Sequence, residues 1–174
     1  MILTGPDINA ERKRGRLVLD PFDPKRVQPN SYDLTLGPTL VHYTGDVLAI
    51  QAENPFVEVE IPGGGFLPEP LRIYLGAHAE VIGSNHYVPR SAAGRARSGP
   101  FVHCTADLID IGSIGASTFQ LHTVQPPKVY AGDRLEQVTF TRVHGDIILY
   151  DGKHQDSRGA QPSKIHQDKT AAAA

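Results

Sequence analysis

Short runs of alternating or continuous apolar residues recur along most of the chain, separated by glycine, proline, asparagine and aspartate. Alternation with a period of two is typical of half-buried strands, and the intervening residue types are those that turns require. The pattern therefore predicts an all-β sandwich or barrel. The runs that carry this prediction are "RLVL", "SYDLTL", "TLVHY", "DVLAI", "FVEVE", "LRIYL", "AEVIG", "LEQVTFTRV" and "DIILY".

Both ends of the chain depart from this strand pattern. The segment "TGPDINAERKRGRL" predicts a short N-terminal helix, with Pro6 in its first turn, basic residues in its last turn and Gly15 as its terminator. From Tyr150 onward few residues are apolar, so this segment lacks the surface that a core requires. We expect a single β domain over residues 1–149 and a mobile polar tail over residues 150–174.

Composition excludes several classes of protein. A net charge of −2 over 174 residues argues against a nucleic-acid partner for the chain as a whole. No apolar run reaches the length of a membrane span, and the N-terminus does not resemble a signal peptide, so we expect a cytoplasmic protein without a membrane partner. The only cysteine, Cys104, leaves no internal disulfide and no Cys-x-x-Cys pair for a zinc deaminase.

The stretch "IGASTFQLHT" has the alternation of a strand with one buried face. Phe119 and Leu121 share one side, and Thr118, Gln120 and His122 share the other. For an anonymous strand, the simplest interpretation is that the polar side meets solvent, with His122 as an exposed strand histidine.

Charge is unevenly distributed in the middle of the chain. Residues 81–106 contain no Asp or Glu, but they contain Arg90, Arg95 and Arg97 near glycine and serine. Guanidinium groups and exposed backbone amides both donate to phosphate oxygens, so a phosphate-bearing ligand is one interpretation. A solvated basic loop is the other.

Several segments, taken in order, resemble the dCTP deaminase branch of the dUTPase-like superfamily. They are "GRLVLDPFDPKRVQPNSYDLTLG", "PRSAAGR", "VHCTADLIDIGSIG", "YAGDRLEQVTF" and "GKHQDSRGAQPSK". The resemblance implies a distorted β-sandwich that assembles as a homotrimer, with active sites between subunits. It also implies a pyrimidine deoxynucleoside triphosphate as ligand, with Mg²⁺ held by the phosphates and no zinc.

The resemblance also assigns roles by position. Arg90 and Ser91 correspond to a pair that contacts phosphate and water, and Arg95 to an arginine that holds the attacking water. Asp110 corresponds to an acid near the deoxyribose. A strand whose backbone reads the base edge corresponds to His103, Cys104, Thr105 and Ala106. In the tail, a phosphate-contacting lysine corresponds to Lys153, with Tyr150, Gln155 and Arg158 as helpers.

The chain departs from the family pattern at Gln120, where the deaminases carry a glutamate. Deamination of cytosine removes a proton from the attacking water and delivers it to the ring and to departing ammonia, which a carboxylate performs and a carboxamide does not. An amide still offers a donor and an acceptor to the pyrimidine edge. Gln120 is therefore expected to be a pocket residue at the catalytic position without the chemistry of a proton shuttle.

Three functions remain open on this basis, and the resemblance favours the first. The first is a dCTP deaminase-type hydrolase that forms dUTP and ammonia, with Gln120, Ser91, Arg95 and Asp110 in its catalytic centre. The second is a dUTPase-like pyrophosphatase, in which Asp110 activates water and Mg²⁺ shields the phosphate charge. The third is a nucleotide-binding homologue without turnover.

Overall fold

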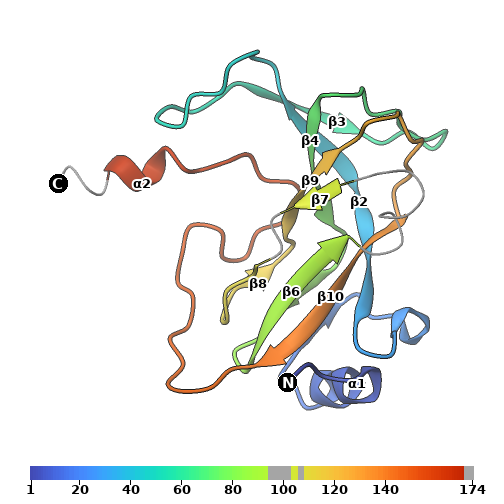
Figure 1. Cartoon of the computed structure of the whole chain (residues 1–174), viewed down its shortest axis with the longest axis vertical. Helices are drawn as coiled ribbons and strands as arrows, with labels where there is room; N and C mark the ends of the chain where they lie inside the picture. The colour runs from blue at the N-terminus through green and yellow to red at the C-terminus, as the bar shows by residue number, and fades with distance from the viewer. Residues whose placement is uncertain (94–102, 106–107, 171–174) are drawn as a thin grey trace.

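The computed structural model describes residues 1–93, 103–105 and 108–170, which form a mostly β structure with a short helix near each end (Figure 1). The elements in chain order are α1 (Gly5–Lys13), β1 (Val18–Asp20), the 3-10 helix η1 (Pro24–Arg26), β2 (Tyr32–Tyr43), β3 (Phe56–Glu60), β4 (Ile73–His78), β5 (Val81–Gly83), β6 (Tyr87–Ala93), β7 (His103–Thr105), β8 (Ile114–Gly115), β9 (Thr118–His122), β10 (Arg134–Arg142) and α2 (Gln167–Thr170).

The described strands form two antiparallel sheets. The smaller has the order β1-β5-β8, and the larger has the order β6-β10-β2-β4-β9-β7, with β3 paired to one end of β2. The larger sheet curls until β6 and β7, at its two ends, lie close together. A single bridge between Arg90 and Leu108 reinforces this approach. The predicted all-β fold class is confirmed.

Four of the predicted runs form different structures from those expected. "SYDLTL" and "TLVHY" belong to one long strand, β2, whose pairing with β4 shifts register between Leu36 and Leu40. "DVLAI" and "DIILY" are not strands. In "DVLAI", the Asn54 side chain accepts from the Ala49 N–H at 2.8 Å and donates to the Ala49 carbonyl at 2.9 Å. These backbone groups are therefore used in a turn and not in strand pairing.

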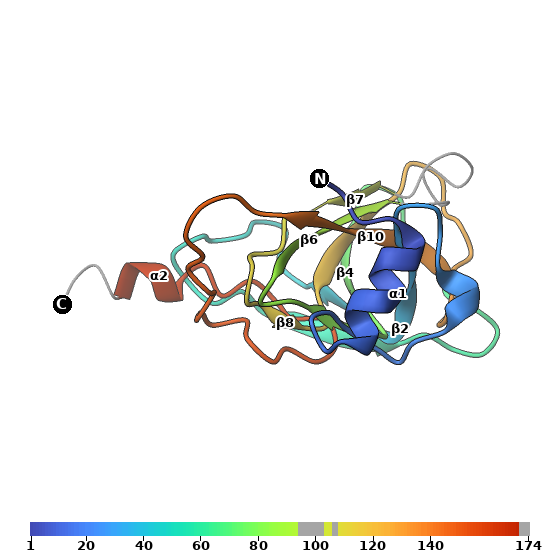
Figure 2. The same cartoon turned by 90° about the horizontal axis from the view of Figure 1, so that it is seen from below.

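The predicted N-terminal helix is confirmed as α1, which lies across the curled sheet (Figure 2). Pro6 stands in the first turn, and Gly15 follows the helix at a φ of 72°, a left-handed conformation that glycine adopts without strain. Ile8 is fully buried and packs into the main core cluster, which includes Leu34 of β2 and Phe140 of β10. This packing fixes the helix despite its short length.

Glu11 on α1 is a buried carboxylate with three partners. It accepts from the Tyr87 hydroxyl at 2.7 Å, from Arg14 at 2.5 Å and from Arg16 at 3.2 Å. The Tyr87 bond, followed by the Arg14 bond, holds the pKa of Glu11 below its ordinary value of 4.5, although burial acts in the opposite direction.

We expect Glu11→Gln to lower stability at pH 7. A lowered folded-state pKa stabilises the fold above the unfolded value, and this stabilisation is lost as pH falls through the folded pKa. The difference in thermal midpoint between wild type and E11Q should therefore shrink as the pH is taken below 4.5. A difference that stays constant from pH 7 to pH 3 would contradict this account.

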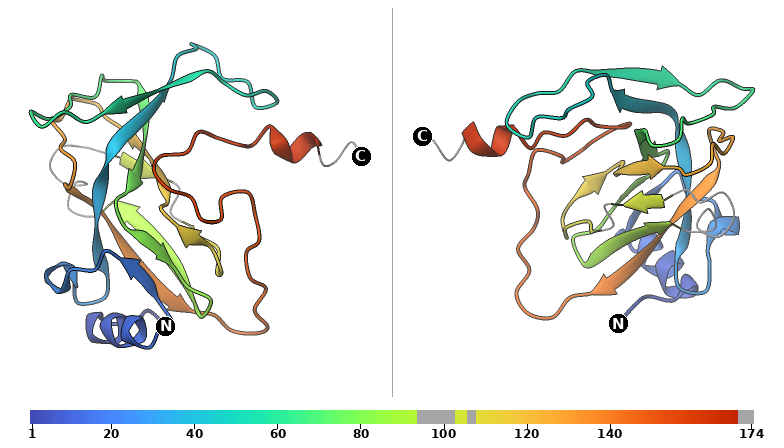
Figure 3. Two further views of the ribbon diagram at one scale, coloured as in Figure 1. Left: turned by 180° about the vertical axis from the view of Figure 1, so that it is seen from behind. Right: turned by 45° about the horizontal axis from the view of Figure 1, so that its top comes forward.

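The C-terminal segment loops back along the outside of the curled sheet, and α2 projects from the body (Figure 3). The tail is held at β8, where the Asp156 N–H donates to the Ile114 carbonyl and the Ala116 N–H donates to the Ser157 carbonyl, both at 2.9 Å. Ala160 is only 8% exposed and packs in a small cluster with Val41 of β2. The expectation that the tail gives nothing to the core is thus wrong at Ala160, while its mobility stays a prediction.

No helix among residues 1–93, 103–105 and 108–170 is long and apolar enough to span a bilayer.

Candidate functional site

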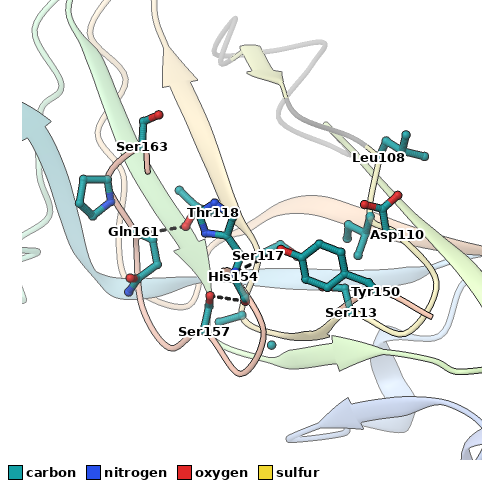
Figure 4. Close-up of a pocket in the computed structure, with 14 residues that line it drawn as sticks. Leu108, Asp110, Ser113, Ser117, Thr118, Tyr150, His154, Ser157, Gln161 and Ser163 are labelled. Atoms are coloured by element: carbon teal, nitrogen blue, oxygen red, sulfur yellow. Dashed lines mark hydrogen bonds between the residues drawn. The ribbon is translucent and has the colours of Figure 1, made fainter. Parts of the chain in front are cut away.

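A cavity of about 290 Å³ lies between the β8–β9 region and the tail (Figure 4). Both segments contribute polar side chains, because β9 turns its polar side outward toward the tail while its Phe119 and Leu121 are buried. The lining residues are Leu108, Ile109, Asp110, Ser113, Gly115, Ala116, Ser117, Thr118, Tyr150, His154, Ser157, Gln161, Pro162 and Ser163.

A tight turn positions Asp110 at this cavity. The Ser113 N–H donates to the Asp110 carbonyl at 3.1 Å, and Gly112 within the turn has a φ of 90°. A Cβ atom on Gly112 would stand 2.7 Å from the Tyr150 backbone nitrogen, so only glycine permits both the turn and the close approach of the tail. Asp110 is exposed, so its carboxylate is accessible to a ligand.

Gln155 fastens the tail to the same turn. Its side-chain oxygen accepts from the Ile114 N–H and its side-chain nitrogen donates to the Gly112 carbonyl, both at 2.9 Å. Both ends of its amide are therefore used to hold the protein together. Gln155 was predicted to assist substrate binding, and the structure shows it as a clamp at the edge of the cavity.

Gln120 lies on the outward side of β9, as the alternation predicted. It pairs with Leu75 of β4 on one side and Thr105 of β7 on the other. It lines a second cavity, of about 360 Å³, whose other lining residues are Tyr43, Leu48, Ala49, Ile50, Asn54, Ile73, Leu75, Thr118, Gln161, Ser163 and Ile165. Thr118, Gln161 and Ser163 line both cavities, so Gln120 and Asp110 lie at adjoining hollows.

The strand predicted to read the base is β7. His103, Cys104 and Thr105 pair with His122, Leu121 and Gln120 of β9, respectively, which places this backbone directly beside the strand that carries Gln120. Two further predicted residues, Arg95 and Ala106, lie outside the described residues.

Arg90 and Ser91 lie on β6, outside the lining of both cavities. Arg90 is exposed, whereas Ser91 points into the curled sheet and donates to the carboxylate of Glu136. Within one chain, the structure does not bring the Ser91 hydroxyl to the cavities.

The two tail cations expected to bind substrate, Lys153 and Arg158, form hydrogen bonds within the tail itself. Lys153 donates to the Lys164 carbonyl at 3.0 Å and forms an ion pair with Asp168. Arg158 donates to the carbonyls of Asp156 at 3.2 Å and Ser157 at 3.0 Å. Tyr150, by contrast, lines the first cavity as expected of a substrate-binding residue.

His154 also lines the first cavity, although it was not among the predicted site residues. Burial, followed by the positive charges of Lys164 and Lys153, lowers the pKa of its imidazole below the ordinary value of 6.5. Sequence patterning gives little sign of this role, because the tail has no regular periodicity and residue spacing alone does not show which side chains turn inward.

Glu136 was also missed, although the strand pattern contained a signal. It shares the inward phase of β10 with Val138 and Phe140, and its side chain is 3% exposed. Its carboxylate accepts from Ser91 and bonds the Nε2 atom of His78 at 2.6 Å. A glutamate at an inward position of an amphipathic strand predicts buried polar partners, since burial without them is costly.

In the described part of the chain, no group of three or more His, Cys, Asp or Glu side chains is placed to hold a metal ion. Nucleotide enzymes commonly hold Mg²⁺ through the substrate phosphates and one or two carboxylates. A Mg²⁺ ion here would therefore take its ligands chiefly from the substrate phosphates.

Comparison with known proteins agrees with this geometry. The family model described as dCTP deaminase-like matches residues 2–143. Among curated relatives, "dCTP deaminase, dUMP-forming" from Clostridium beijerinckii is 39% identical over 173 residues, covering 97% of this chain and 98% of the relative. Proteins of the same name from Leptospira biflexa and Cytophaga hutchinsonii are 37% and 36% identical over the same share of the chain.

A solved structure supports the fold. The 2'-deoxycytidine 5'-triphosphate deaminase from Agrobacterium tumefaciens superposes with a TM-score of 0.66 at 20% identity, over 82% of this chain. This chain spans about half of that longer chain, 48% of its length. The family match over most of the sequence and the similarity to relatives over nearly their full length lead to one conclusion: this chain belongs to the dCTP deaminase-like family.

Proposed function

We propose that this chain hydrolyses dCTP to dUMP, ammonia and pyrophosphate. The proposal is carried by the similarity, over 97% of the chain, to proteins named dUMP-forming dCTP deaminases. The two adjoining cavities share Thr118, Gln161 and Ser163, and they support the proposal because together they give one nucleotide access to both Gln120 and Asp110. The dUTP expected from the sequence then becomes an intermediate.

Two water molecules are consumed in the proposed reaction. One attacks C4 of cytosine, and the amino group leaves as ammonia while a carbonyl forms at C4. The other attacks the α-phosphorus with loss of a proton to Asp110, and the bond to the bridging oxygen breaks to release pyrophosphate. Mg²⁺ bound to the triphosphate supplies positive charge that stabilises the leaving group. The backbone of β7 and the amide of Gln120 bind the pyrimidine edge.

A homotrimer with sites between subunits remains part of the proposal. Arg90 is exposed on β6, away from both cavities of its own chain, so its predicted contact with phosphate requires a site completed by another subunit. Light scattering on the purified protein tests the trimer, and cell fractionation tests the cytoplasmic location.

The experiment that tests the function follows all products in one sample. The protein is incubated with Mg²⁺ and dCTP, and separately with dUTP, while ammonia, dUTP, dUMP and pyrophosphate are quantified. Equal amounts of ammonia, dUMP and pyrophosphate from dCTP support the proposal. Accumulation of dUTP would restrict the activity to deamination. Pyrophosphate from dUTP without ammonia from dCTP would indicate a dUTPase-like pyrophosphatase, and binding without products would indicate a nucleotide-binding homologue.

Asp110→Asn should separate the two reactions. Loss of the carboxylate removes the proposed base for hydrolysis of the triphosphate, so pyrophosphate release should fall about 10²-fold. Ammonia release should fall much less, and dUTP should accumulate. Asp133→Asn is the control, since this aspartate also belongs to a tight turn, where its carboxylate accepts from the Tyr130 N–H at 2.8 Å, but lines neither cavity. Equal loss of both products in D110N would contradict the assignment.

A further inference from the structure

The cavity at Asp110 contains an imidazole beside the strand that carries Gln120. Its ionisable lining residues are Asp110, Tyr150 and His154 (Figure 4). Thr118, which lines the same cavity, lies two residues before Gln120 on the same outward side of β9. His154 therefore lines a cavity that reaches the outward side of β9, the side that carries Gln120 at the position where the resemblance places a catalytic carboxylate.

The backbone on both sides of His154 is fixed, while its ring is not used in the fold. Its N–H donates to the Tyr150 hydroxyl at 3.1 Å, and its carbonyl accepts from the Ser157 N–H at 3.3 Å. The next residue, Gln155, is the clamp to the turn at Gly112. No described residue hydrogen-bonds either ring nitrogen of His154, so the imidazole can serve a molecule in the cavity.

The charges around the ring favour its neutral form. Burial is the largest cause of the lowered pKa of His154, and Lys164 and Lys153 add to it, while Asp168 on the same tail opposes it. From the other side of the cavity, the ionisable groups are Asp110 and Tyr150. A neutral imidazole at pH 7 can accept a proton, and the resulting imidazolium can return it.

We propose that His154 is the proton-transfer residue of the deamination, acting in place of the carboxylate that Gln120 lacks. This assignment rests on the proposed function. As water attacks C4, the imidazole takes a water proton and delivers it to N3, which has received the electron pair of the C4–N3 double bond. The imidazole then moves the remaining hydroxyl proton to the amino group. The C4–N bond breaks, ammonia leaves and the C4 carbonyl forms, with no net uptake of protons.

The test compares His154→Asn with wild type for ammonia release and for dCTP binding by calorimetry. We expect kcat for ammonia to fall about 10²-fold, because general acid–base help is lost, with little change in affinity. Wild-type kcat should decline as pH falls through the lowered pKa of His154, below 6.5, and H154N should lack this acid limb. Added imidazole should restore part of the H154N rate, which a purely structural role would not produce.

His122→Asn is the matched control, since His122 is an exposed histidine on the same side of β9 as Gln120 and lines neither cavity. It should keep the wild-type rate. Ammonia release by wild type with an unchanged kcat in H154N, or a loss that imidazole does not restore, would overturn the inference alone. No ammonia from wild type would overturn the proposed function and this inference with it.

Discussion

Gln120→Glu should deaminate dCTP about 10²-fold faster than wild type, measured as kcat for ammonia release at pH 7. The substitution replaces one amide nitrogen with an oxygen on an exposed side chain of β9, so the strand pairing with β4 and β7 should persist. The gain is expected because a carboxylate carries protons between water, ring and amine, whereas the amide only forms hydrogen bonds.

The size of this gain depends on His154. General acid–base catalysis typically contributes about 10² to 10⁴ in rate, and we expect the lower end because the proposed imidazole already supplies part of that function. In the Q120E background, His154→Asn should cost little, because the introduced carboxylate performs the same proton transfer. The two substitutions should thus be strongly non-additive, as expected for groups that perform the same step.

His122→Glu controls for added charge, because it places a carboxylate on the same side of β9, two residues away. It should leave kcat near the wild-type value. An equal rise in kcat in both variants would point to a general electrostatic effect. An unchanged kcat in Q120E would show that position 120 is not the catalytic position. Binding of dCTP by Q120E, measured by calorimetry, separates loss of recognition from loss of turnover.

Local patterns predicted those elements whose side chains alternate or whose ends carry clear signals. The segment around Phe119 and Leu121 shows both buried and outward positions, and α1 has a proline start and a glycine stop, so each was found from sequence. "DIILY" carries the same apolar signal but forms no strand, and its Ile148 is 89% exposed. Apolar content alone does not decide whether a sheet edge is available for pairing.

The site was less predictable than the fold because its walls come from distant segments. Resemblance pointed to Asp110, Tyr150 and Gln120, and the structure places each of them at a cavity. The resemblance gave no reason to expect the hydrogen bond from Gln155 to the Gly112 carbonyl or the one from Lys153 to the Lys164 carbonyl within the tail. Such contacts depend on how the tail packs at β8, which residue spacing in a polar segment does not encode.

Glu136→Ala should lower the free energy of unfolding by about 2–6 kcal/mol, because it leaves two buried donors without an acceptor. Glu136 accepts from two buried groups, the Ser91 hydroxyl and the Nε2 atom of His78. The alanine variant would leave both without their acceptor, and each buried donor left unsatisfied costs about 1–3 kcal/mol. Urea unfolding at a fixed protein concentration is the measurement.

Two further variants identify the cause of that loss. Thr139→Ala, on the opposite side of β10, is half-buried and makes only a long 3.4 Å contact with the Arg90 carbonyl, so it should change stability by about 0.5 kcal/mol or less. The double variant S91A/E136A should be less destabilised than the sum of its single variants, because Ser91→Ala removes one of the two orphaned donors. Strict additivity would show that the destabilisation of E136A comes from lost packing volume, since a cavity at position 136 costs the same whether or not the Ser91 hydroxyl is present.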